Sequence, residues 1–234
     1  MEGIVSCAEE ERNLEMVKFN RFKEISGSYV SEITGQSRLG YSISDTVDFY
    51  DMIEWLKRGD YRGSIILFYD YDNREIYKPF KQQKNVLYGS PVFLKESYWF
   101  LQGDFNKKKI TLFRYLPDNT PEMITQLDTD KVELNNLRIT GEDIHITSED
   151  DDFKCYYPLE FGFAKDIHEG VDFIADGKVY MSSWVEEGWD TDSNCPTENY
   201  EYYDKMVVRD FSGNLISEER GSLFQRDDGS WWIA

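Results

Sequence analysis

The feature that most constrains the fold of this chain is a repeated pattern of short strands joined by tight turns. In the first type of unit, two strands flank a turn. Val171–Ser183 (VDFIADGKVYMSS) has Asp176-Gly177 at its centre, and Leu223–Ala234 (LFQRDDGSWWIA) has Asp228-Gly229. Asp-Gly favours a β-hairpin because glycine adopts positive φ angles without steric cost. Two further segments follow this outline with weaker turn residues, Leu137–Ser148 and Val92–Gln102.

A second type of unit alternates with these hairpins. It begins with apolar residues, continues through a charged or aromatic residue and a turn, and ends in another strand. Its members are Val207–Glu218, Leu67–Lys78, Leu112–Thr125 and, more loosely, Met16–Ile25. Alternation of the two types every ~35–50 residues is typical of a radial array of four-stranded blades, and it predicts about five of them. The expected blades are 26–80, 84–128, 131–167, 169–218 and a last one divided between 220–234 and 1–25.

The two chain ends complement each other in this scheme. The chain finishes on a first-type hairpin that has no second-type partner, and it starts with strands that no hairpin precedes. Pairing of the termini would complete one blade and cover two sheet edges that otherwise invite aggregation. We therefore predict an all-β, propeller-like array closed by its N- and C-terminal strands, in a single domain over 1–234. A plain β-sandwich is the alternative.

Across most of its length the chain resembles small β-propeller proteins in general, on the strand repeat just described. Asp228-Gly229-Ser230-Trp231 is also similar to the turn of an Asp-box, the hairpin motif of sialidase-type propellers. Its spacer is one residue shorter than in that motif, and it occurs once. We therefore interpret it as a hairpin turn that places Trp231 and Trp232 on opposite faces, and infer no sialidase activity.

One segment departs from the strand pattern and predicts a helix near 44–57. Ser44 or Asp45 can cap its first turn, and Gly59 is well placed to end it. Apolar residues recur at helical spacing within it, at Val47, Tyr50, Ile53 and Leu56.

Charge restricts the partners that such a chain can have. With 45 acidic and 26 basic residues its formal net charge is −19, which repels nucleic-acid phosphates and anionic lipid head groups. No stretch approaches the ~20 apolar residues of a membrane helix, and the start of the chain does not read as a signal peptide. Three sparse cysteines, Cys7, Cys155 and Cys195, are typical of reduced thiols. We expect a cytoplasmic protein that binds neither nucleic acid nor membranes.

One acidic run has the spacing of a calcium loop. Asp190, Asp192 and Asn194 supply oxygen atoms at alternate positions, and Glu201 stands where a bidentate twelfth ligand would be. Cys195 occupies the position where such a loop needs glycine, so a solvated loop is the competing interpretation. Calcium is thus the only cofactor that the sequence suggests. A second run, Glu149–Asp152, is expected to lie in water at a hairpin tip.

Motifs that would define an enzyme are missing from the sequence. It contains no GxSxG, GxxxxGK[ST] or GxGxxG pattern, and its two histidines, His145 and His168, are isolated. We therefore expect a non-catalytic module that binds a partner protein or a small neutral ligand. Two alternatives stay open: a carbohydrate-active hydrolase that uses paired carboxylates, and an acidic inhibitor or immunity-type protein that covers a basic partner.

Overall fold

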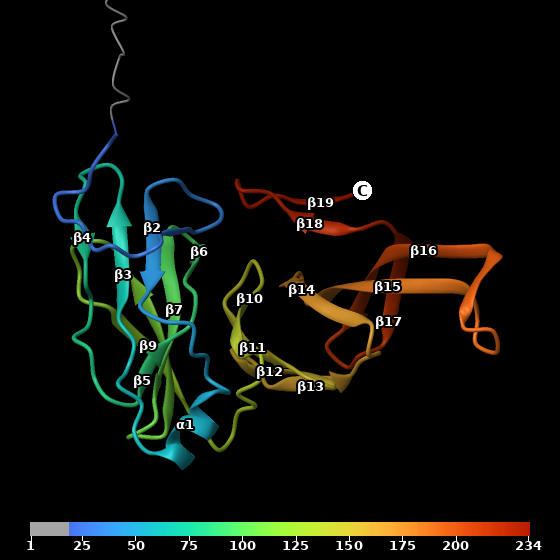
Figure 1. Ribbon diagram of the computed structural model, residues 1–234, viewed down its shortest axis with the longest axis horizontal. Helices are drawn as coiled ribbons and strands as arrows, with labels where there is room; N and C mark the ends of the chain where they lie inside the picture. Colours follow the sequence, from blue (N-terminus) through green and yellow to red (C-terminus); the bar gives the residue numbers. More distant parts are fainter. Residues whose placement is uncertain (1–18) are drawn as a thin grey trace, which may run out of the picture.

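The computed structural model describes residues 19–234, which form a series of small antiparallel sheets in chain order (Figure 1). These residues contain nineteen strands and one short helix, α1 (Met52–Arg58). The all-β class is therefore confirmed. Within 19–234, no helix is long and apolar enough to cross a membrane.

The first four of the five predicted blades each correspond to one sheet, built from consecutive strands that pair with one another. The first sheet comprises β1 (Ser31–Glu32), β2 (Leu39–Ile43), β3 (Ile66–Asp70) and β4 (Ile76–Tyr77). The second comprises β5 (Val86–Tyr88), β6 (Val92–Leu94), β7 (Ser97–Asp104), β8 (Lys109–Tyr115) and β9 (Glu122–Asp128). Here β5 and β6 pair with different stretches of β7, so together they act as one interrupted strand.

The remaining strands follow the same plan. The third sheet comprises β10 (Arg138–Thr140), β11 (His145–Glu149), β12 (Asp152–Tyr157) and β13 (Phe161–Ala164). The fourth comprises β14 (Glu169–Ala175), β15 (Lys178–Asp190), β16 (Cys195–Asp210) and β17 (Leu215–Arg220). The fifth has two strands among the described residues, β18 (Leu223–Gln225) and β19 (Trp231–Ile233).

Apolar cores lie between consecutive sheets. The first and second sheets share a cluster around Phe68 and Phe100, and the second and third share one around Leu112 and Ile146. The third and fourth share a smaller cluster that includes Phe153 and Met181. Alternation of side chains along each strand explains this arrangement, because it gives an inner sheet one apolar face for each neighbour.

The predicted hairpins are confirmed, and two of them close with tight two-residue turns. Ala175 pairs with Lys178, so Asp176-Gly177 forms a two-residue turn in which both φ angles are positive. The turn at Lys95-Glu96 has the same shape without any glycine. Asp228-Gly229 lies in a wider loop between Gln225 and Trp231, which pair with each other. The predicted hairpins thus form even where their turn residues are unfavourable.

The expected pairing of the chain ends is wrong for residues 19–25. These residues form no strand, and they lie against the first sheet rather than the fifth. The Lys23 amide donates to the carbonyl of Arg74, and Phe22 packs against the rings of Tyr69 and Tyr71. Apolar and aromatic contacts with the nearest sheet therefore hold this segment. The rest of the predicted N-terminal strands, residues 1–18, lies outside the described residues.

The helix is confirmed but is shorter than predicted, because it begins at Met52 instead of near residue 44. The residues expected to cap it are engaged elsewhere. The Ser44 amide donates to Ile65 O, which extends the pairing of β2 with β3. The Asp45 carboxylate accepts a hydrogen bond from the Tyr61 hydroxyl at 2.6 Å. Gly59 follows the last helical residue, as predicted.

Candidate functional site

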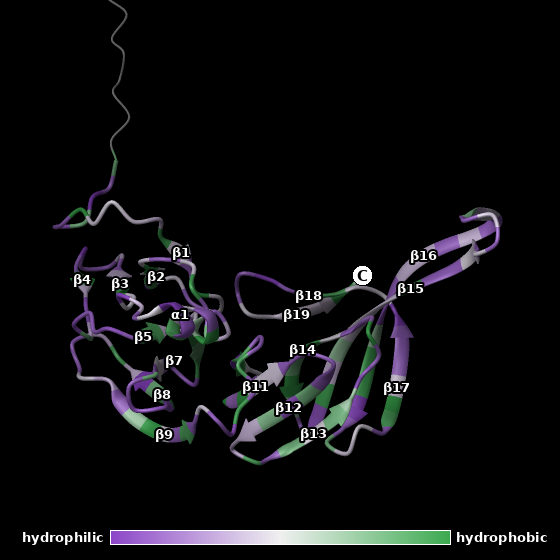
Figure 2. Cartoon of the chain, turned by 60° about the horizontal axis from the view of Figure 1, so that its bottom comes forward, coloured by the Kyte–Doolittle hydropathy of each residue, from purple (hydrophilic) through white to green (hydrophobic). Residues whose placement is uncertain are grey.

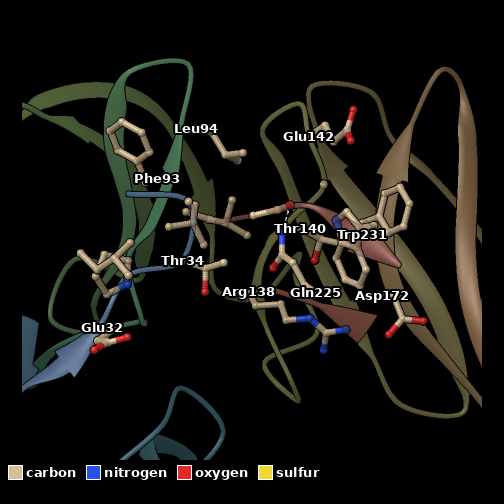
Figure 3. Close-up of a pocket in the computed structure, with 18 of the residues that line it drawn as sticks. Glu32, Thr34, Phe93, Leu94, Arg138, Thr140, Glu142, Asp172, Gln225 and Trp231 are labelled. Atoms are coloured by element: carbon tan, nitrogen blue, oxygen red, sulfur yellow. Dashed lines mark hydrogen bonds between the residues drawn. The ribbon is translucent and has the colours of Figure 1, made fainter. Parts of the chain in front are cut away.

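A pocket of about 370 Å³ lies where all five sheets meet (Figure 3). The first strand of every sheet, or the loop beside it, contributes to its wall. The residues that line it are Glu32–Gly35 and Tyr41 from the first sheet, Pro91–Leu94 from the second, Arg138–Glu142 from the third, Asp172 and Phe173 from the fourth, and Gln225, Gly229 and Trp231 from the fifth. Its volume is within the range of small-molecule sites.

Stacked aromatic rings form one wall of the pocket. The ring of Phe173 lies between those of Tyr180 and Trp231, with centroid distances of 4.4 and 4.5 Å and near-parallel planes. A bulge in β14 between Val171 and Phe173 disturbs the strict alternation of side chains, so Asp172 and Phe173 both reach the pocket. The half-buried Trp231 therefore presents a flat apolar surface beside a carboxylate.

A largely buried carboxylate, that of Glu149, fixes the position of Arg138 at the wall of the pocket. Its guanidinium donates to Glu149 Oε2 at 3.0 Å and to Val171 O at 2.8 Å. Glu149 also accepts the Val171 amide at 3.2 Å and lies 3.5 Å from the Lys165 ammonium, which is 8% exposed. Glu149 was expected at a solvated hairpin tip, and this expectation is wrong. Its side chain joins the third sheet to the fourth instead.

Two neutral side chains, Gln225 and Thr34, offer hydrogen-bonding groups to a ligand. The side-chain NH2 group of Gln225 donates to Gly229 O at 3.1 Å. The side-chain carbonyl oxygen of Gln225 is left to accept a hydrogen bond from another partner. Thr34 lines the opposite wall, on the first sheet (Figure 3). The pocket's three carboxylates, Glu32, Glu142 and Asp172, outnumber its one guanidinium, so its electrostatics disfavour anions.

Asp172 is the pocket carboxylate with a perturbed pKa. Burial raises the pKa of Asp172 by penalising its charged form, and this outweighs the hydrogen bond that it accepts from the Ser182 hydroxyl at 2.6 Å. The ionised carboxylate therefore costs stability at neutral pH. That cost disappears as the pH falls through the folded-state pKa, because the folded protein binds the proton more readily than the unfolded chain.

We expect the substitution Asp172→Asn to raise the melting temperature at pH 7. An amide keeps the shape of the side chain and can still accept from Ser182, but it carries no charge to desolvate. The gain should shrink towards zero below about pH 4, where the wild-type carboxyl is itself protonated. Melting curves of both proteins across this pH range are the measurement. The same substitution at the exposed Asp151 is the control, and a gain equal at every pH would contradict the assignment.

One backbone contact joins the fifth sheet to the first at the edge of the pocket. The Gly35 amide donates to Asp227 O at 2.9 Å. A β-carbon on Gly229 would lie 3.2 Å from the Gly35 α-carbon, and Gly229 has a φ of +86°. Glycine is thus needed at position 229 both for the turn and for this approach. A second cavity, of about 480 Å³, lies on the other side of the same contact and shares residues Glu32–Gly35.

The four candidate calcium ligands lie at and near the tip of the β15–β16 hairpin. Asp190 accepts the Asp192 amide at 2.9 Å and the Ser193 hydroxyl at 2.6 Å, and Asn194 has a φ of +51° in the turn. Glu201 lies farther along β16, where it forms an ion pair with Arg220. Among residues 19–234, no group of three or more His, Cys, Asp or Glu side chains is placed to hold a metal ion. Calcium binding here stays a prediction.

The histidines and cysteines are not brought together. His145 is buried in β11, and its Nδ1 lies 3.0 Å from Asp143 O. His168 packs against the ring of Trp184. Cys155 is buried, which raises the pKa of its thiol to about 11, whereas Cys195 is exposed. Cys7 lies outside the described residues.

Sequence reasoning did not single out the pocket, although it noted some of its residues. Trp231 and Trp232 were predicted to lie on opposite faces of their hairpin. Trp231 stacks on Phe173, whereas Trp232 lies on the other face and is 52% exposed. Arg138 and Asp172 carried no signal, because their roles depend on contacts between sheets.

The fold and the pocket define a class, namely an all-β protein made of successive antiparallel sheets, three of them four-stranded, with a small-molecule-sized cavity where they meet. Comparison with protein-family models, curated proteins and solved structures gave no match for this chain.

Proposed function

We propose that this protein is a binding module that holds a small, neutral, hydroxyl-bearing ligand in the central pocket. The observation that carries the proposal is the stacked pair Phe173–Trp231, which presents an aromatic surface inside a concave site lined by all five sheets. Flat aromatic faces receive the apolar face of a saccharide or polyol, while nearby polar groups fix its orientation.

Charge and hydrogen bonding support a neutral ligand. Arg138 is already paired with Glu149, and Asp172 already accepts from Ser182, so neither needs a ligand to satisfy it. An anion would meet the excess of carboxylates, and the whole chain adds a net charge of −19. Hydroxyl groups, by contrast, can donate to the Gln225 carbonyl oxygen and exchange hydrogen bonds with Thr34.

We favour binding over hydrolysis on the arrangement of the carboxylates. A glycosidase needs two carboxyl groups about 5–10 Å apart that face the same bond. Glu32 and Glu142 lie on opposite sides of the pocket (Figure 3). Asp172 has the raised pKa of a general acid, but its carboxylate is held by Ser182. The raised pKa is the one feature that keeps hydrolysis as a second candidate.

We also propose that the five sheets form a closed, propeller-like ring around the pocket. Three cores between successive sheets, the Phe173–Trp231 stack and the Gly35–Asp227 hydrogen bond support this. A closed ring should unfold in a single transition.

We expect Trp231→Ala to weaken binding of the ligand by about 5- to 150-fold, since loss of a stacking platform removes about 1–3 kcal/mol. The probe is a panel of neutral mono- and disaccharides, and calorimetric titration measures their dissociation constants. Trp232→Ala is the matched control, because it removes the neighbouring indole from the exposed face and should change affinity less than about twofold.

Two outcomes would contradict this proposal. One is that no member of the panel binds the wild-type protein. The other is that Trp232→Ala weakens binding as much as Trp231→Ala does, which would place the ligand outside the pocket. For the closed ring, a chain that lacks Leu223–Ala234 should unfold, because it loses the Phe173–Trp231 stack and the Gly35–Asp227 hydrogen bond; an unchanged melting temperature would contradict the ring.

A further inference from the structure

The hairpin β15–β16 extends well beyond the fourth sheet as a two-stranded arm, which we define as residues 184–204 (Figure 2). Inside the sheet, β15 pairs with β14 as far as Ser183, and β16 pairs with β17 from Lys205 onward. At the base of the arm, Trp184 N donates to His168 O and Asp204 O accepts from Gly221 N. Between these points the two strands pair only with each other among the described residues. The arm therefore presents an open edge along 185–190 and another along 196–203, where a further strand can add.

The arm carries acidic residues and no basic ones. It contains seven acidic residues and no Lys or Arg: Glu186, Glu187, Asp190, Asp192, Glu198, Glu201 and Asp204. Charge in this protein is thus concentrated on the element that projects farthest from the cores. A strand edge that carries charges of one sign repels its own copies and attracts a segment of the opposite sign.

A row of exposed aromatic rings follows one face of the arm. Trp184 and Tyr202 stack with a centroid distance of 6.1 Å, and Trp189 and Tyr200 meet edge to face at 5.9 Å. The Tyr200 hydroxyl donates to Glu186 at 2.8 Å, which links the two pairs. The four rings are between 38% and 58% exposed, although large aromatic side chains are usually buried. Such rings beside carboxylates bind ammonium and guanidinium groups through their π-faces.

On the opposite face of the arm, an aromatic ring and a carboxylate already bind a guanidinium group. The guanidinium of Arg220 lies 4.1 Å from the centre of the Tyr203 ring, and it forms an ion pair with Glu201. A ring and a carboxylate on neighbouring positions of β16 thus hold one arginine. On the aromatic row, Tyr202 pairs across the arm with Glu186, but no Lys or Arg of the described chain lies over its ring.

We propose that the arm docks an extended, lysine- or arginine-rich segment of a partner protein. The segment adds to the open edge beside β15, so alternate side chains fall on the aromatic row. There, basic groups lie over Trp184 and Tyr202 and pair with Glu186 and Asp204. A second copy of this chain does not fit the arm, because two arms would bring together fourteen carboxylates. The site is separate from the central pocket and uses none of its residues.

The test uses a synthetic peptide of about eight residues that alternates Arg and Thr, so that its basic side chains share one face. A peptide with Glu in place of Arg is its control. We expect the basic peptide to bind and to change tryptophan fluorescence, whereas the acidic one does not. Affinity should fall at least about tenfold between 50 and 500 mM NaCl, because the contact depends on charge.

Two changes to the protein locate the peptide. In the shortened arm, Asn-Gly replaces residues 185–203. This two-residue turn joins Trp184 to Asp204, which already pair across the hairpin, so the fourth sheet can still form. In the second variant, Glu186→Gln and Asp204→Asn remove the two charges assigned to the peptide without shortening any strand. We expect at least about tenfold weaker binding in the first variant and about threefold or more in the second.

The control for charge is the pair Asp150→Asn and Asp151→Asn, which removes the same number of charges from the tip of the β11–β12 hairpin. It should leave peptide affinity within about twofold of wild type. Equal weakening by this control would show that net charge alone attracts the peptide and would overturn the proposal. So would unchanged binding by the shortened arm. A molar mass that doubles in solution and returns to that of the monomer when the arm is shortened would identify a second copy as the occupant.

Discussion

Glu149→Ala should lower the free energy of unfolding by about 3–5 kcal/mol, the usual cost of removing one partner from a buried ion pair. The Glu149 carboxylate accepts hydrogen bonds from the Arg138 guanidinium and the Val171 amide, and it forms an ion pair with the Lys165 ammonium. The side chains of Glu149 and Lys165 are 13% and 8% exposed. Without Glu149, the Lys165 charge stays buried with only the Glu169 carbonyl oxygen to accept from it. Urea denaturation monitored by circular dichroism measures the change.

The neighbouring hairpin tip provides the control for Glu149. Asp151→Ala removes an exposed acidic side chain two residues away and should change stability by less than about 0.5 kcal/mol. The double variant Glu149→Ala/Lys165→Met should lose less than the sum of its parts, because methionine removes the stranded charge. An additive result would show that the two groups do not interact.

Phe100→Ala is expected to cost about 3–5 kcal/mol as well, through the cavity that it leaves. Phe100 is fully buried between the first and second sheets. Its ring contacts those of Phe68, Phe80, Tyr88 and Phe113. Four aromatic neighbours cannot collapse into the gap without leaving their own rotamers, so the structure relaxes little. The same urea experiment, followed by tryptophan fluorescence, measures the loss.

Phe224→Ala is the matched substitution for Phe100, because the side chain of Phe224 is 43% exposed in β18. We expect a loss below about 1 kcal/mol there. Phe100 and Glu149 belong to different sheets, so the two large losses also test the single domain over 1–234. If both shift one common transition in circular dichroism and fluorescence, the sheets unfold together. Two separate transitions, each sensitive to one substitution, would contradict a single domain and a closed ring.

The arm could be located from the sequence only in part. Residues 184–204 read as a long acidic and aromatic stretch around a turn, and this stretch gave the calcium hypothesis. Sequence pattern does not show that β15 and β16 continue past their neighbours, because that depends on where β14 and β17 stop. The open edges and the shared aromatic face follow from that difference in length.

Local chemistry explains why the strands and hairpins could be predicted. Asp176-Gly177 adopts its turn, and apolar side chains alternate along β14 and β15, through interactions within a few residues. The helix shows the limit of this reasoning. Ser44 and Asp45 are good capping residues, but they take partners in the following segment, at Ile65 and Tyr61. A tertiary hydrogen bond outweighed a local propensity of similar size.

The amino-acid sequence by itself thus determined the β class, the hairpins and the order of the sheets, since each depends on neighbouring residues. Packing between sheets determined the pocket, the burial of Glu149 and the position of residues 19–25. The pocket joins residues from Glu32 to Trp231. Glu149 looked solvated beside Asp150–Asp152 and is buried because Arg138 in β10 and Lys165, which follows β13, reach it from distant parts of the chain. Contacts of this kind depend on how distant strands meet, and no short stretch of sequence encodes them.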